Sequence, residues 1–173
     1  MGAGKTTIGR RVAKRLNKMF YDLDWYIEAR MHRTIPELFE ERTEEGFRQI
    51  ERNMLHEVAE FGDVVVSCGG GTPCFFDNMD YMNQQAETIY LKATPEVLFS
   101  HLQMGRTERP LLMGKSHDEM LAYIASQVEQ REAFYAKARY TMSVNLLDNY
   151  AKVDDAVNMV LDLLEIKETK ETL

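Results

Sequence analysis

One short run of apolar residues near the middle of the chain limits the possible folds more than any other feature. Residues 63–68 read Asp-Val-Val-Val-Ser-Cys and lack the apolar–polar alternation of a strand with one face in water. Such a run is typical of a strand buried on both faces in a parallel sheet. It ends at Gly69-Gly70-Gly71, and three consecutive glycines are costly to order unless the backbone must approach another group closely.

Strand and helix patterns alternate along the rest of the chain. Further strands are predicted at residues 19–23, 88–91 and 141–145, and helices at 6–17, 25–31, 34–58, from 95 onwards, 118–138 and 153–166. Thr34 and Glu37 have the spacing of a capping box, a break in the helix is expected near residues 44–46, and residues 167–173 are expected to fray. This alternation predicts an α/β fold with three layers, α/β/α, around a central parallel sheet. The Gly- and Pro-containing stretch 106–117 is expected to be a mobile connection.

Composition narrows the class of protein. The 173 residues fit a single domain, and 21 Lys and Arg against 28 Asp and Glu give a net charge of −7, which argues against a nucleic-acid or anionic-membrane binder. No apolar stretch approaches the roughly 20 residues that span a bilayer. The two cysteines, Cys68 and Cys74, are too few for a disulfide framework or a zinc site. We therefore expect a soluble, cytoplasmic protein without a signal peptide, which holds any anion with a local cluster of positive groups.

The first residues match the second half of the phosphate-binding motif G-x-x-x-x-G-K-[ST]. Gly2 and Gly4 would let backbone N–H groups surround phosphate oxygens, Lys5 would reach the β- and γ-phosphates, and Thr6 would ligate Mg²⁺. The plainer alternative is a glycine-flanked helix start with an exposed lysine. The first glycine of the motif and the strand before it would precede Met1. We therefore expect a sheet of about five strands whose first strand is absent from this sequence, leaving unpaired backbone on two neighbours.

Two acidic residues close the strand predicted at 19–23. A spacing of two would put Asp22 and Asp24 on the same face of that strand, one near Mg²⁺ and one near a substrate hydroxyl, as phosphoryl transfer requires. The alternative makes Asp24 a helix N-cap and leaves Asp22 solvated.

Three arginines are candidates for binding an anionic substrate. Arg48 lies one helical turn from Glu51, a spacing that is most simply explained by a surface ion pair. Arg109 in the mobile stretch and Arg131 on the long helix could both be solvated charges. Alternatively, two arginines beside a substrate carboxylate would supply a bidentate grip.

Taken together, these motifs resemble the shikimate kinases, a small family of nucleoside-monophosphate-kinase-like P-loop enzymes. The resemblance covers nearly the whole chain in order. It rests on Gly2-Ala3-Gly4-Lys5-Thr6-Thr7, Phe20-Tyr21-Asp22-Leu23-Asp24 with Ile27-Glu28, Phe47-Arg48 with Ile50-Glu51, Gly69-Gly70-Gly71, Arg109-Pro110-Leu111-Leu112, and Arg131 with Phe134-Tyr135.

The resemblance implies ATP-dependent phosphorylation of the 3-hydroxyl of shikimate on the route to chorismate and the aromatic amino acids. It implies that the nucleotide phosphates are bound by Gly2, Ala3, Gly4, Lys5, Thr6 and Thr7, and Mg²⁺ by Thr6 and, through water, Asp22. Substrate-binding helices would span about 24–60, with shikimate bound by Asp24, Arg48, Gly69, Gly70, Gly71 and Arg131. Asp24 would be the base for the 3-hydroxyl. Arg109, in a lid at about 105–118, would contact ATP and stabilise the transferring phosphoryl group. Shikimate is the expected partner, with no nucleic acid or membrane, and the protein is expected to be a monomer.

Two other functions stay open at this stage. The chain could be a related kinase for another small polyol or acid, such as gluconate. It could also be a non-catalytic P-loop domain that binds a nucleotide or a partner protein, because the motif is incomplete.

Overall fold

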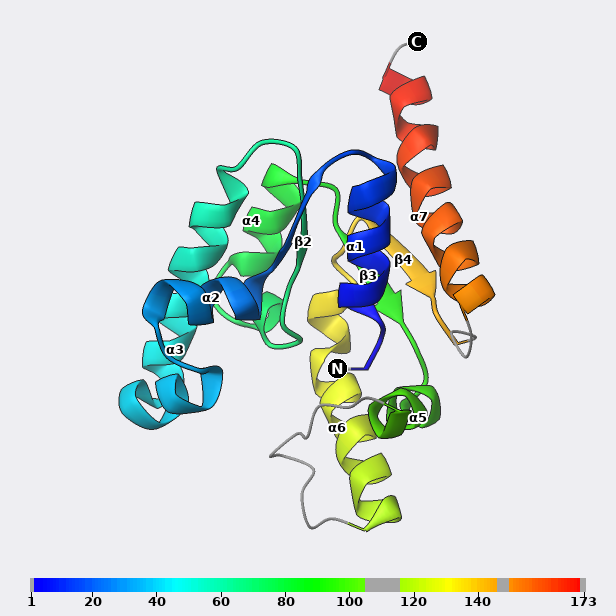
Figure 1. The fold of residues 1–173 in the computed structure, drawn as a ribbon. Helices are drawn as coiled ribbons and strands as arrows, with labels where there is room; N and C mark the ends of the chain where they lie inside the picture. The colour runs from blue at the N-terminus through cyan, green and yellow to red at the C-terminus, as the bar shows by residue number, and fades with distance from the viewer. Residues whose placement is uncertain (1, 105–115, 146–149, 172–173) are drawn as a thin grey trace. The chain divides into compact units, whose positions relative to one another are not determined.

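The chain forms an α/β structure with parallel strands (Figure 1). The computed structural model describes residues 2–104, 116–145 and 150–171. The chain divides into two compact units, residues 5–87 and residues 1–4 with 88–173, and we describe each unit by itself. No described helix is long and apolar enough to cross a lipid bilayer.

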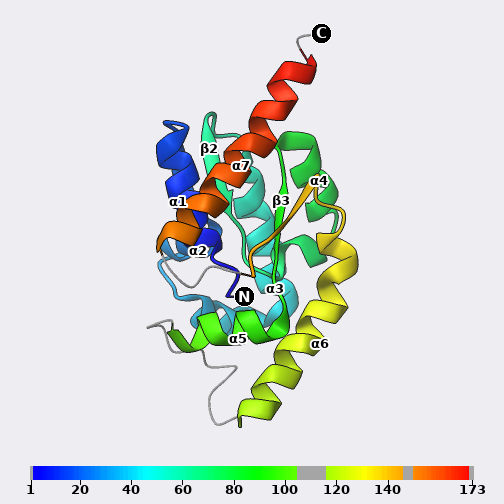
Figure 2. The ribbon, with the colours of Figure 1, turned by 90° about the vertical axis from the view of Figure 1, so that its right-hand side faces the viewer.

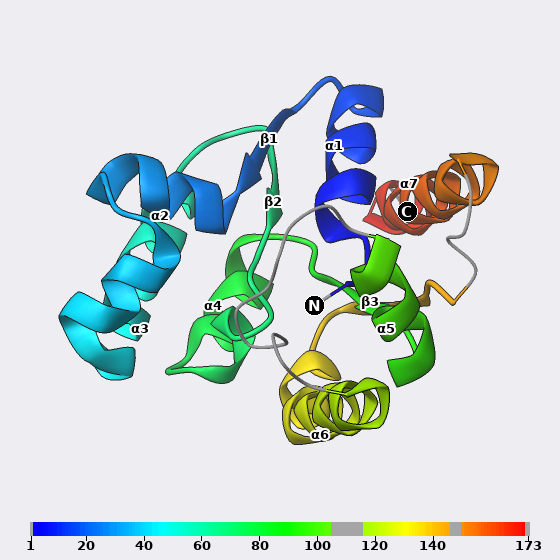
Figure 3. The ribbon, with the colours of Figure 1, turned by 60° about the horizontal axis from the view of Figure 1, so that its bottom comes forward.

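The unit of residues 5–87 carries two parallel strands, four α-helices and one 3₁₀-helix among its described residues. Along the chain these are α1 (Lys5–Arg15), β1 (Met19–Asp22), α2 (Leu23–Met31), α3 (Ile35–Ala59), β2 (Val64–Ser67), the 3₁₀-helix η1 (Thr72–Cys74) and α4 (Asn78–Gln85). In the strand register, Met19 lies opposite Val64 and Asp22 opposite Ser67. Helix α1 packs against both strands (Figure 3), and α2 packs against α3 (Figure 1).

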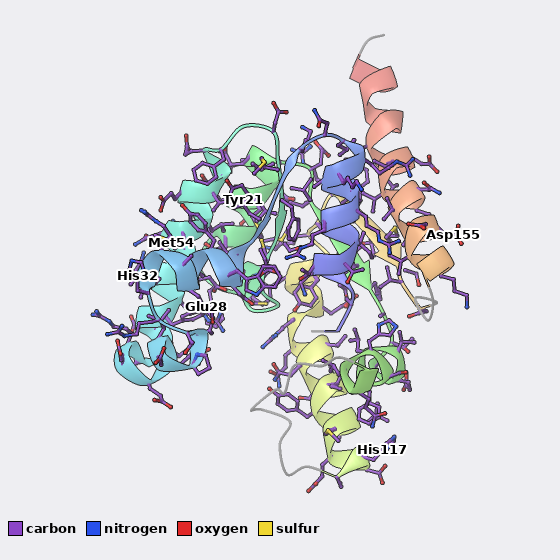
Figure 4. All side chains as sticks on the ribbon, in the orientation of Figure 1. Tyr21, Glu28, His32, Met54, His117 and Asp155 are labelled. Carbon is purple, nitrogen blue, oxygen red and sulfur yellow. The ribbon has the colours of Figure 1, made fainter. Side chains whose placement is uncertain are left out.

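The core of this unit lies between its helices and strands. Six buried apolar side chains form it: Leu23, Ile27, Leu38, Phe47, Leu55 and Val58. Full burial of one such side chain contributes about 1.5–3 kcal/mol to folding. Tyr21, labelled in Figure 4, extends the core through ring contacts with Tyr26 and Phe61, at centroid distances of 5.9 and 5.3 Å.

Helix α3 begins and bends where the sequence predicts. The side chain of Thr34 accepts a hydrogen bond from the backbone N–H of Glu37, and the Glu37 carboxylate accepts one from the N–H of Thr34 at 2.7 Å. Glu28 on α2 also accepts from the N–H of Ile35 at 2.9 Å, which ties α2 to the start of α3 (Figure 4). The break lies at Thr43, whose φ of 60° and ψ of 170° interrupt the helix one residue before the predicted stretch.

The second unit contains the other parallel pair. Its elements are β3 (Ile89–Lys92), α5 (Pro95–Met104), α6 (His117–Tyr135), β4 (Tyr140–Ser143) and α7 (Tyr150–Glu171). Ile89 lies opposite Tyr140 in the register. Ser116 and Glu119 form a second capping box at the start of α6, and α5 packs against α6 (Figure 2).

The α/β class and the positions of the four predicted strands are confirmed, but two local predictions are wrong and one helix was missed. Residues 64–66 are only half-buried, because among the described residues β2 is bonded to a single strand, β1, and the four strands form two pairs. Helix α4 was not predicted, since its sequence Asn-Met-Asp-Tyr-Met-Asn-Gln-Gln has little apolar periodicity. Helix α7 continues to Glu171, where fraying was expected, because residues 166–171 include the helix-favouring Lys and Glu.

Candidate functional site

Asp22 and Thr6 meet where β1 ends and α1 begins. Asp22 occupies the N-cap position of α2, but its side chain makes no capping hydrogen bond. Instead, the Thr6 hydroxyl donates to Asp22 Oδ2 at 2.8 Å. Hydroxyl and carboxylate oxygens are the ligand types that Mg²⁺ prefers. No group of three or more His, Cys, Asp or Glu side chains suited to a metal occurs among the described residues.

Asp24 lies in the first turn of α2 and not on the strand. The prediction that Asp22 and Asp24 share one strand face is wrong, because β1 ends at Asp22 and the helix starts at Leu23. The N-cap alternative is wrong as well, since Asp22 holds that position. Burial raises the pKa of Asp24, the carboxylates of Asp22 and Glu51 raise it further, and the nearby Lys5 ammonium lowers it. Asp24 is therefore a carboxyl group with increased proton affinity beside a positive charge.

Arg48 and Glu51 form a largely buried ion pair, so the surface-pair interpretation is wrong. Arg48 Nη1 donates to Glu51 Oε2 at 2.8 Å, and the two side chains are 11% and 2% exposed. The other Glu51 oxygen accepts a 2.6 Å hydrogen bond from the hydroxyl of Thr72. Arg48 Nη2 also donates to the exposed carboxylate of Glu44 at 3.4 Å. The guanidinium is thus fixed in direction by acceptors on α3.

Aromatic rings enclose the same guanidinium. The Arg48 Cζ atom lies 4.1, 5.2 and 5.6 Å from the ring centroids of Phe75, Phe47 and Phe39. Cation–π contacts of this kind favour the charged group and restrict its movement. Arg48 Nε is buried and has no hydrogen-bond partner, so one donor of the fork remains unused.

The triple glycine borders both charged groups, as the prediction of a close backbone approach requires. A Cβ on Gly69 would lie 3.0 Å from Asp24 Oδ1, and a Cβ on Gly71 would lie 2.7 Å from both Nη atoms of Arg48. Gly71 has ordinary right-handed dihedrals, φ −84° and ψ −28°, so space and not backbone conformation demands glycine there. The turn from Gly69 to Gly71 therefore has a carboxylate at one end and a guanidinium at the other.

Both glycines of the phosphate motif adopt backbone conformations that favour glycine, while phosphate binding by the motif stays a prediction. Gly2 and Gly4 adopt φ values of 74° and 79°, in the left-handed region that favours glycine. Ala3 is buried, Thr7 is exposed, and α1 begins at Lys5 directly after Gly4. Lys5 is half-buried and lies close enough to Asp24 to affect its pKa, which contradicts the plain alternative of an exposed lysine.

The two remaining predicted arginines are placed differently. Arg131 lies on α6 and lines a small pocket of about 50 Å³ with Ala3, Tyr90 and Tyr135. Next to it, Glu132 accepts hydrogen bonds from the Tyr90 hydroxyl at 2.9 Å and from Lys92. Arg109 lies outside the described residues, as does most of the predicted lid. The pairing of Arg131 with Arg48 and the role of Arg109 stay predictions.

Four residues linked to Arg48 were not found from the sequence: Phe39 and Phe75, which contact it, Thr72, which bonds to Glu51, and Asn78, which bonds to Thr72. The pair Phe75-Phe76, a few residues after the glycines, was a usable signal, because aromatic rings can bind arginine side chains, and these two contact Arg48 and Arg52. Thr72 and Asn78 carry no sequence pattern that separates them from ordinary turn residues.

The chain is similar to known proteins over most of its length. A family model described as shikimate kinase matches residues 1–162. The shikimate kinase of Bacteroides thetaiotaomicron is 49% identical over 166 residues, which are 96% of this chain and 95% of that protein.

Solved structures agree with the sequence comparison. A crystal structure of shikimate kinase from Bacteroides thetaiotaomicron superposes with a TM-score of 0.93 at 50% identity, covering 95% of this chain and 94% of that one. The structure of Acinetobacter baumannii shikimate kinase in complex with shikimate has a TM-score of 0.82 at 30% identity, with 96% and 89% coverage. This chain belongs to the shikimate kinase family.

Proposed function

We propose that this chain transfers the γ-phosphoryl group of ATP to the 3-hydroxyl of shikimate, giving shikimate 3-phosphate and ADP. The observation that carries the proposal is the glycine turn, with Asp24 against Gly69 and Arg48 against Gly71. A substrate lying along this turn would meet a carboxyl group at one end and a guanidinium at the other. Shikimate has the matching pair of groups, ring hydroxyls and a carboxylate. The family membership and the shikimate complex of the Acinetobacter baumannii relative support the same substrate.

The substrate carboxylate would bind to Arg48. Its guanidinium is held by Glu51 and Phe75. A guanidinium with fixed orientation loses little entropy when it binds a carboxylate through two hydrogen bonds. Arg131 is the proposed second arginine of the grip, and the backbone of Gly69 to Gly71 would lie against the ring.

Asp24 is the proposed base. As the 3-hydroxyl oxygen attacks the γ-phosphorus, the oxygen–phosphorus bond forms, the bond to ADP breaks, and the hydroxyl proton passes to the Asp24 carboxylate. The raised pKa of Asp24, caused by its burial and its acidic neighbours, suits it to accept that proton. Lys5 would stabilise the negative charge on the phosphates, as would Arg109, while the backbone of residues 2–7 would bind the phosphate oxygens.

Magnesium is the proposed cofactor, and the residues present fit it. Mg²⁺ usually keeps several waters and binds through one or two side-chain oxygens together with substrate phosphates. The adjacent Thr6 hydroxyl and Asp22 carboxylate are such a pair, and we propose direct ligation by Thr6 and ligation through water by Asp22. When bound, Mg²⁺ neutralises charge on the phosphate oxygens. A cytoplasmic location and a monomeric state complete the proposal, and size-exclusion chromatography with light scattering tests the latter.

A coupled assay of ADP release with shikimate and with gluconate tests the proposed function. We expect turnover that depends on shikimate and Mg²⁺, and a loss of at least about 100-fold in kcat for Lys5→Ala, because the charge at the phosphates is removed. Lys14→Ala, on an exposed position of the same helix, is the matched control and should retain wild-type turnover. Equal turnover on gluconate would favour the related-kinase alternative. ATP binding without any turnover would favour the non-catalytic domain.

A further inference from the structure

Thr72 joins three parts of the unit of residues 5–87. Its side chain is fully buried, and its hydroxyl donates to Glu51 Oε1 at 2.6 Å. Its backbone N–H donates to the carbonyl of Gly69 at 3.2 Å, and its carbonyl accepts from Nδ2 of Asn78 at 2.9 Å. One residue therefore connects the glycine turn, helix α3 and helix α4.

The hydroxyl of Thr72 determines which oxygen of Glu51 accepts a hydrogen bond from Arg48. Glu51 is 2% exposed, so water contributes little to its solvation and its oxygens need donors from the protein. Thr72 supplies the donor for Oε1, and Arg48 supplies the donor for Oε2. With Oε1 occupied, the carboxylate has one orientation, and the guanidinium that binds Oε2 has one position beside Gly71.

Asn78 fixes Thr72 from the other side. Its side chain is fully buried, it stands at the start of α4, and its Nδ2 bonds to the carbonyl of Thr72. Its own backbone N–H donates to the carbonyl of Phe75 at 3.3 Å, so the turn that carries Phe75 is held as well. The hydrogen bonds run in sequence from Asn78 through Thr72 and Glu51 to Arg48.

We propose that Thr72 is a positioning residue, which orients the Arg48 guanidinium for the substrate carboxylate by donating its hydroxyl proton to Glu51. The consequence for shikimate binding rests on the proposed function; the effect on Arg48 itself does not. Thr72 touches no reacting atom in the proposed reaction. Its loss should weaken binding of shikimate and leave the binding of ATP unchanged.

The Thr72→Val variant tests the proposal because it keeps the shape and removes the hydroxyl. We expect KM for shikimate to rise about tenfold, as when a buried carboxylate loses a hydrogen-bond donor, with kcat and KM for ATP within about twofold. Thr72→Ser, which keeps the hydroxyl, should restore the wild-type KM. Thr72→Ala adds no atom to the buried site, so it is the second variant if Thr72→Val does not fold. It also lacks the hydroxyl and should likewise raise KM for shikimate.

The side-chain ¹H–¹⁵N NMR signals of arginine follow Arg48 without any reaction. The Arg48 signals, assigned with Arg48→Lys, should shift and broaden in Thr72→Val and Thr72→Ala. The signals of Arg30 on α2, which is paired with Glu57 at 3.0 Å, should stay unchanged as an internal control.

Unchanged Arg48 signals in both variants would overturn the proposal, and so would a wild-type KM for shikimate in either folded variant. If the wild-type chain turned over no shikimate, the proposed function would fail, and the NMR comparison would still decide the positioning role.

Discussion

Replacing Gly71 by alanine puts one methyl group into the contact between the glycine turn and Arg48. The added Cβ would lie 2.7 Å from Nη1 and Nη2 and 2.9 Å from Cζ, all shorter than an ordinary contact of 3.4 Å or more. Because the backbone of Gly71 already suits an L-residue, the effect of the substitution is steric. The guanidinium must therefore move, or the turn must move away from it.

The size of the effect follows from how little room Arg48 has. Relief of the overlap needs a shift of about 0.7 Å, the difference between 3.4 and 2.7 Å. A shift of that size away from Glu51 would lengthen the 2.8 Å hydrogen bond to the limit of hydrogen bonding, and Phe75 lies 4.1 Å away. A hydrogen bond to a charged group contributes about 1.5–3 kcal/mol, so we expect Gly71→Ala to lower the free energy of unfolding by about that amount. The same loss in substrate binding corresponds to a rise of about 10–150-fold in KM for shikimate.

Steady-state kinetics and urea denaturation measure the two effects of Gly71→Ala. Gly62→Ala is the matched control, because a Cβ on Gly62 would have nothing within 4 Å, and it should leave both quantities at wild-type values. KM for ATP should stay unchanged in both variants. Wild-type KM for shikimate and wild-type stability in Gly71→Ala would refute the idea that Arg48 is confined against the turn.

Three further predictions concern strain, buried charge and thiol reactivity. Thr43 has a φ of 60° and a ψ of 170°, a region open almost entirely to glycine, so Thr43→Gly should stabilise the protein by about 1 kcal/mol and raise Tm by about 2–4 °C. Thr43→Ala keeps the strained backbone and loses the hydrogen bond from the Gly46 N–H to the Thr43 hydroxyl, so it should lower Tm. A higher Tm for Thr43→Ala than for Thr43→Gly would show that the backbone at Thr43 is not strained. Asp24→Asn should abolish turnover but raise stability at pH 8, because the folded-state pKa of Asp24 is raised and its ionised form disfavours the fold. The difference in free energy of unfolding between Asp24→Asn and the wild type should shrink as the pH falls through the folded-state pKa of Asp24. Urea denaturation of both proteins at pH 8 and pH 5 measures this difference. Cys68 is half-buried, but desolvation raises the pKa of its thiol to about 12, so mass spectrometry should show that iodoacetamide alkylates Cys68 at pH 8 more slowly in the folded protein than in the urea-unfolded protein.

Much of the fold could be predicted because its signals are local. The β-branched residues at 64–66 indicate a strand by themselves, and the capping box of Thr34 and Glu37 depends on residues three apart. The position of Asp24 was misjudged because a strand and a helix join there without a loop, and a spacing of two has meaning only within one strand.

The surroundings of Arg48 could not be predicted from the sequence, because they depend on contacts between distant segments. A spacing of three residues between Arg48 and Glu51 is the same for a surface pair and a buried pair. What distinguishes the two is Thr72, which is 21 positions from Glu51 and approaches it only when the turn after β2 folds onto α3. The triple glycine predicted from the sequence that some group approaches the backbone closely. Only the structure shows that these groups are Arg48 and Asp24.

According to the proposed function, this chain phosphorylates the 3-hydroxyl of shikimate, and Asp24 accepts its proton. ³¹P NMR of the wild-type chain with shikimate, ATP and Mg²⁺ tests it most directly, because the phosphorus–proton coupling identifies the carbon that carries the phosphate. We predict one new phosphomonoester signal, coupled to the proton on C3 of shikimate, which grows together with the signals of ADP. The appearance of inorganic phosphate without a phosphoester, or of a phosphate on another hydroxyl, would contradict the account.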